Sequence, residues 1–116
     1  MSASSTPEPT PPVKSIFSTN TAFAALKTDG SVVTWGESFN GGYSGTVAAQ
    51  LSGDVKTIFS TDRSFAALKT DGSLVTWGNP YTGGDSTSVA AELSSDVEAV
   101  FSTTFAFAAL KTDGSV

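Results

Sequence analysis

The stretch FAALKTDGSVVTWG, residues 23–36, returns almost unchanged as FAALKTDGSLVTWG at residues 65–78. In both copies an apolar run ends at Lys-Thr-Asp-Gly, and a second apolar run that ends in Trp-Gly follows. Asp-Gly between two apolar runs is a strong short-range signal for a β-hairpin, because glycine adopts the positive φ of a tight turn at little steric cost. Two complete hairpins and the opening of a third are therefore expected, at Asp29-Gly30, Asp71-Gly72 and Asp113-Gly114.

The similarity extends well beyond the hairpin. Residues 13–54 align without gaps on residues 55–96, with 28 of 42 positions identical, and residues 97–116 match 13 of their 20 positions with the second copy. Short apolar runs repeated every 42 residues are typical of the blades of a β-propeller. The predicted fold is all-β, an incomplete β-propeller with two complete blades and a partial third on a 42-residue repeat.

Each unit is expected to begin with a short strand, VKSIFS in the first copy, and to continue with the two strands of the hairpin. It closes with VAAQL (47–51) or VAAEL (89–93), which could form a short helix or a fourth strand. A strand or an irregular edge is favoured, because five residues are too few for a stable helix. Residues 1–12, rich in Ser, Thr and Pro, are predicted to be a linker or tail.

These stretches resemble the signature of the regulator of chromosome condensation repeat family, in which an apolar strand, an acidic-Gly turn and a strand ending in Trp-Gly recur. The family continues through a Gly-rich loop, a Val-x-x-Leu segment and a Val-x-x-Ile strand, which here read GGYS, VAAQL and VKTIF. The resemblance implies propeller blades and, from the founding members, guanine nucleotide exchange on a small GTPase. The His that often precedes the second strand is replaced by Ala22, Ser64 and Ala106, and the Gly after the first strand by Ser-Thr, which indicates a divergent bacterial or phage-type branch.

Composition removes several classes of function. Without cysteine or histidine the chain cannot hold a thiolate nucleophile, a Ser-His-Asp relay, a zinc finger or a His-ligated metal. Six scattered bases against 11 acids argue against nucleic acid as a partner. The longest apolar run, Phe105 to Leu110, is too short to cross a bilayer, so no membrane insertion is expected.

Residues that recur in every unit serve the architecture, since catalysis needs a residue only once. By this criterion the Asp-Gly acids are turn residues, the lysines before them are solvated, and the two Trp residues fill the space between blades while each N–H finds a carbonyl. Asp54 and Asp96 are expected to cap turns. The sequence therefore predicts no catalytic residue, no metal and no cofactor.

Positions that differ between units cluster in the connections after the first and the third strand, where binding residues usually lie. The predicted partner-binding residues are Arg63, Phe39, Tyr43, Tyr81 and Asp85. The alternative is neutral drift on exposed loops.

The leading hypothesis for function is a non-enzymatic interaction module that presents these loops to a protein or glycan. Nucleotide exchange on a small GTPase, or a purely structural segment of a larger surface protein, are the alternatives. The polar start favours an extracellular or cell-surface context. Because propellers need about four to eight blades, the ring is expected to be completed by further blades of a longer chain or by a homo-oligomer.

Overall fold

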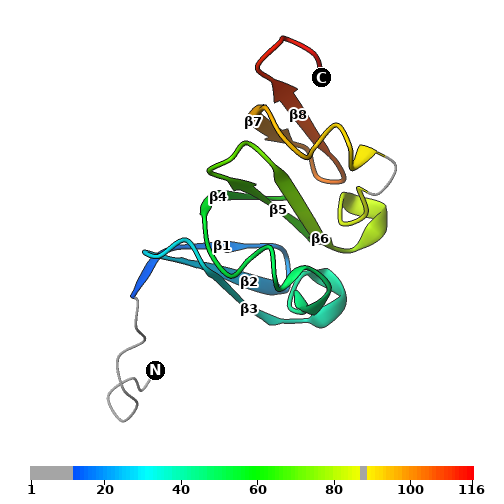
Figure 1. Cartoon of the computed structure of the whole chain (residues 1–116). Coiled ribbons are helices and arrows are strands. Elements are labelled where there is room, and N and C mark those ends of the chain that lie inside the picture. Colours follow the sequence, from blue (N-terminus) through cyan, green and yellow to red (C-terminus); the bar gives the residue numbers. More distant parts are fainter. Residues whose placement is uncertain (1–11, 87–88) are drawn as a thin grey trace.

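Each repeat unit folds into one small antiparallel sheet. The computed structural model describes residues 12–86 and 89–116. The sheets have the orders β1-β2-β3, β4-β5-β6 and β7-β8 and follow one another through the molecule (Figure 1). The strands are β1 (Val13–Ser18), β2 (Ala22–Lys27), β3 (Val32–Gly36), β4 (Val55–Ser60), β5 (Ser64–Lys69), β6 (Leu74–Gly78), β7 (Val97–Ser102) and β8 (Phe107–Lys111). The all-β prediction is confirmed.

The predicted hairpins form at the Asp-Gly turns. In the first, β2 pairs with β3 in a register that places Leu26 opposite Val32. The turn is closed by the Gly30 N–H, which donates to the Lys27 carbonyl at 3.0 Å. Asp29 Oδ1 accepts hydrogen bonds from both the backbone N–H and the hydroxyl of Ser31, at 2.9 and 2.6 Å. The same contacts recur at the other two turns, so four residues specify this structure locally.

The VAAQL segment is not a strand, in contrast to one of the two favoured interpretations. Its first residue ends the short 3-10 helix η3 (Gly45–Val47), and the next residues continue as turns. The Leu51 carbonyl accepts from Val32 N–H at 2.9 Å, and its side chain is buried. The segment therefore forms the expected irregular edge beside β3. Leu93 accepts from Leu74 N–H in the same way, at 2.8 Å.

Successive units are joined where a hairpin turn meets the start of the next unit. Val55 N–H donates to the Gly30 carbonyl at 2.9 Å, and Thr70 N–H donates to the Asp54 carbonyl at 2.9 Å. Asp54 has a left-handed φ of 62° and Asp96 a φ of 65°, as expected of residues that end a turn. The equivalent bonds join the second and third units, so the junction is repeated along with the sequence.

The core lies between the sheets rather than within any one of them. Leu26 and Leu51 of the first unit are buried in one cluster with Ile58, Phe65 and Trp77 of the second. A second cluster joins the second and third units through side chains that include Leu68, Leu74, Val97 and Val100. Apolar burial is therefore shared between neighbouring sheets, and the two-stranded sheet β7-β8 in particular would be marginal by itself.

The two tryptophans, predicted to be equivalent, lie in different surroundings. Trp77 is 2% exposed, and its indole N–H donates to the Gly41 carbonyl of the preceding unit at 3.1 Å. The predicted inter-unit role is confirmed for this residue. Trp35 is 44% exposed, because its side of the first sheet is not covered by another unit among the described residues. For Trp35 the expected buried role is therefore wrong in this structure.

Candidate partner-binding surface

The connections after the first strand of each unit lie in a row. Asn20 N–H donates to the Asp62 carbonyl at 2.7 Å, and Asp62 N–H donates to the Thr104 carbonyl at 3.0 Å. These positions are separated by 42 residues, so the row follows the repeat. An open polar groove of about 540 Å³ runs along the row, lined by Ser18, Thr19, Asn20, Ser60, Thr61, Asp62, Ser102, Thr103 and Thr104. We call this row and the turns bonded to it the loop end.

In the first two units, the turn after the third strand lies at this same end. In the first unit this turn contains the 3-10 helix η2 (Ser38–Asn40), and the Thr19 hydroxyl donates to the Asn40 carbonyl at 2.9 Å. In the second it contains η4 (Pro80–Thr82), where the Thr61 hydroxyl donates to the Thr82 carbonyl at 2.8 Å. The two variable clusters of the sequence, far apart along the chain, thus form one surface.

Buried hydroxyl groups hold this surface in place. Thr61 Oγ1 and Ser64 Oγ are 2.6 Å apart, and Ser64 Oγ also donates to the Thr82 carbonyl. The side-chain oxygen of Asn79 accepts a hydrogen bond from the Tyr81 N–H at 2.9 Å, and the backbone N–H of Asn79 donates to the Arg63 carbonyl. No buried side-chain nitrogen or oxygen of the described residues is left without a hydrogen bond. A satisfied network of this kind rigidifies the backbone that presents the exposed side chains.

Three of the five predicted residues lie at the loop end. Arg63 is exposed in the β4–β5 connection. Phe39 and Tyr81 occupy the same position of η2 and η4, one repeat apart, and are 62% and 88% exposed. Exposed aromatic side chains of this size on a fixed backbone are available for contact with a partner.

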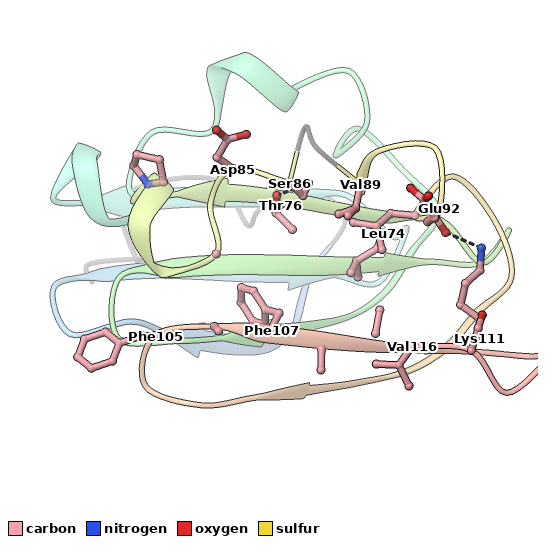
Figure 2. A pocket seen from close by; sticks show the side chains of 17 residues that line it. Leu74, Thr76, Asp85, Ser86, Val89, Glu92, Phe105, Phe107, Lys111 and Val116 are labelled. Atoms are coloured by element: carbon pink, nitrogen blue, oxygen red, sulfur yellow. Dashed lines mark hydrogen bonds between the residues drawn. The ribbon is translucent and has the colours of Figure 1, made fainter.

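The other two predicted residues lie apart from that row. Tyr43 and Asp85 are equivalent in the repeat, and both follow the 3-10 turn. The Tyr43 ring is exposed and lies over Gly45, where an added Cβ would meet it. Asp85 lines a different groove, between β6 and β8 (Figure 2). The five residues therefore do not form one site.

Phe105 is a surface residue that the prediction did not include. It occupies the repeat position of Thr21 and Arg63, and its side chain is 64% exposed. The change from Thr21 to Arg63 to Phe105 at equivalent positions of the repeat was the signal available in the sequence.

The acids do not gather into a metal site in this structure. Within the described ranges, no three Asp or Glu residues lie close enough to hold an ion. The pKa of Asp29, Asp71 and Asp113 lies below the ordinary value of 3.8, because each carboxylate accepts hydrogen bonds from the serine two residues later. These acids thus serve the hairpin turns. In residues 12–86 and 89–116 no helix is long and apolar enough to span a membrane.

Comparison with known proteins does not extend this description. No protein-family model matches the sequence, and no curated protein matches it either.

Proposed function

We propose that the chain consists of β-propeller blades related to the regulator of chromosome condensation repeat and acts as a non-enzymatic interaction module. Its loop end binds a protein partner, with a glycan as the second candidate. Two features support the blade assignment. Each repeat unit makes one antiparallel sheet that packs on the next, and the first strands β1, β4 and β7 follow one another as neighbours, as strands around an axis would.

The observation that carries the binding proposal is the hydrogen-bonded loop row. Repetition places one connection from each unit at the same end, and bonds from Asn20 to Asp62 and from Asp62 to Thr104 keep the three in register. Sequence identity between units is lost at positions 20–22 and 37–40 and their equivalents, while the strands and the Ser-Thr pairs that support them stay nearly constant. A constant scaffold with varied exposed loops is the usual arrangement of a binding module.

The side chains at the loop end favour a protein over a sugar. Arg63, Tyr81 and Phe105 belong to residue types that are enriched at protein interfaces, where arginine and the aromatics carry much of the binding energy. The row beneath them is polar, which suits the rim of an interface.

Site-specific photo-cross-linking tests the proposal in the cells that make the protein. A benzophenone amino acid at position 81 or 39 is expected to give a discrete cross-linked species, and the same group at exposed Lys56 on β4 is the matched control. Arg63→Ala should weaken the species formed at position 81. Equal products from position 56 would contradict the loop-end assignment.

A printed array of defined oligosaccharides, probed with wild type and with Tyr81→Ala, tests whether the loop end binds a glycan.

Nucleotide exchange provides a separate test of the non-enzymatic assignment. Faster release of a fluorescent guanine nucleotide from a small GTPase, at sub-stoichiometric amounts of this chain, would contradict it.

A further inference from the structure

An apolar groove lies between the second unit and β8 (Figure 2). It has a volume of about 620 Å³. One wall comes from the second unit and includes Leu74, Val89 and Leu93, and the other is β8 with Phe107 and Ala109. Lys111 Nζ donates to the Glu92 carbonyl at 2.6 Å and so ties the two walls together at one end. Within the described part of the chain, β8 pairs with β7 alone, so its second edge has no partner strand.

The same groove exists one unit earlier, where a strand occupies it. There β6 pairs with the edge of β5, placing Trp77 opposite Phe65 and Val75 opposite Ala67. Trp77 and Val75 pack into the cluster that contains Leu51 and Val47. The Trp77 indole donates to the Gly41 carbonyl, and its ring centroid is 5.3 Å from that of Phe65.

Every one of these contact groups recurs in the groove beside β8. Val89 and Leu93 take the places of Val47 and Leu51, one repeat later. Gly83 and Phe107 take those of Gly41 and Phe65. The molecule therefore shows, between its first two units, what covers this surface between its second and third.

We propose that the groove is a strand-acceptor site that binds an extended peptide segment with the pattern Val-x-Trp-Gly. The segment adds to β8 as an antiparallel strand. Its Trp lies against Phe107 and donates its N–H to the Gly83 carbonyl, and its Val lies against Ala109 between Val89 and Leu93. Strand addition of this kind takes affinity from main-chain hydrogen bonds and specificity from pockets for alternate side chains. One end of the groove reaches Pro80 and Phe105 at the loop end, but the contacts proposed for the Trp and the Val lie along β8 and do not depend on the function proposed for the loops.

A synthetic peptide tests the site on the 116-residue chain. The probe is SLVTWGN, the sequence of residues 73–79, with both ends blocked. Isothermal titration should show saturable binding with one peptide per chain. The peptide with alanine in place of Trp should bind at least about tenfold more weakly, since a buried Trp anchor commonly contributes more than that. Absence of saturable binding up to about 1 mM, or equal binding of the two peptides, would overturn the proposal.

A matched pair of protein variants locates the site. Val89→Lys alters a groove wall at a residue that is already 45% exposed, so the fold should be retained, and peptide affinity should fall about tenfold. Tyr81→Ala, at the loop end, should leave peptide affinity unchanged. Amide shift changes on peptide addition should map to β8 and to residues 83–86 and 89–93. Amide shift changes confined to β2 and β3, or an equal loss of peptide affinity in both variants, would contradict this location of the binding site.

Discussion

At the scale of single residues, the tryptophan that ends the third strand shows how much a side chain depends on its neighbours. Trp35 and Trp77 occupy the same repeat position and contact equivalent phenylalanines, with ring centroids 5.4 and 5.3 Å apart. Only Trp77 is buried against a preceding unit and hydrogen-bonded to it. The two residues are thus alike in sequence and in local contacts, but we expect them to contribute differently to the free energy of unfolding.

Alanine substitutions should separate the two. Trp77→Ala is expected to lower the free energy of unfolding by about 3–5 kcal/mol, the usual cost of removing a buried aromatic side chain. Trp35→Ala should cost less than about 1 kcal/mol. Urea unfolding followed by circular dichroism measures both. Equal losses would mean that the face around Trp35 is covered in solution.

The Asp-Ser turn predicts a dependence of stability on pH. The pKa of Asp71 is lowered in the folded protein, first by the hydrogen bond from the Ser73 hydroxyl and then by the bond from its N–H. A lowered folded pKa stabilises the protein above the unfolded pKa, and this contribution is lost as pH falls through the folded value. Asp71→Asn should therefore be less stable than wild type at pH 7, and the difference should shrink below the ordinary value of 3.8.

Thermal unfolding of wild type and Asp71→Asn across this pH range gives the measurement. Asp29 and Asp113 are present in both proteins, so their titration cancels in the difference. A difference that stays constant from pH 7 to well below the ordinary pKa of 3.8 would contradict the role of the charge.

At the scale of elements, the hairpin turn also serves as the joint between units. Val97 N–H donates to the Gly72 carbonyl at 2.8 Å, and Thr112 N–H donates to the Asp96 carbonyl at 2.9 Å. A Cβ at Gly72 would lie 2.8 Å from the Asp96 backbone nitrogen. The turn residue therefore has two functions, the positive φ of the turn and the close approach of the next unit.

Alanine substitutions at Gly72 and Gly114 separate these two functions. Gly72→Ala carries both the strain of φ +85° and the backbone clash, whereas Gly114→Ala has φ +89° and no atom within 4 Å of the added Cβ. The cost at Gly114 should be about 1 kcal/mol, that of alanine in a left-handed conformation, and the cost at Gly72 should be clearly larger. Urea unfolding measures the loss in free energy of unfolding for both variants. Similar losses would show that the junction accommodates the added Cβ at little cost.

At the scale of the whole molecule, one face of the first sheet exposes a row of apolar side chains. Ile16, Phe23, Val33 and Trp35 are each between 44% and 59% exposed. Their equivalents in the second unit are buried or partly buried against the first unit. The equivalent face of the second sheet is covered by the first unit. An exposed apolar face of this kind favours association with another surface.

We expect the purified chain to associate as its concentration rises. Burial of one large apolar side chain is worth about 1.5–3 kcal/mol, so several together can hold two copies in contact. The double substitution Val33→Lys and Trp35→Ser should shift the chain toward monomer, while Tyr81→Ala, at the loop end, should not. Sedimentation velocity over a hundredfold range of concentration, on the order of 1–100 μM, measures this. A wild-type monomer throughout would contradict the expectation.

The hairpins could be predicted from the sequence because their contacts are local. Asp29 bonds to Ser31 within three residues, and the apolar strands on either side need only to pair. The repeat then extended the prediction to all three units. The irregular 47–51 segment was harder, since Leu51 makes its bond to Val32, which lies far from it in the chain.

What the sequence by itself determined is therefore the unit: its strands, its turns and its 42-residue period. Tertiary structure decided which copy of each residue is buried and which loops meet. Lys69, expected to be solvated, donates to the Gln50 carbonyl of the preceding unit at 2.5 Å. Arg63 and Tyr81 lie at the same end of the second unit, whereas Asp85 lines another groove. The physical reason is that turns form within a few residues, whereas burial depends on a neighbouring unit that identical residues do not share equally.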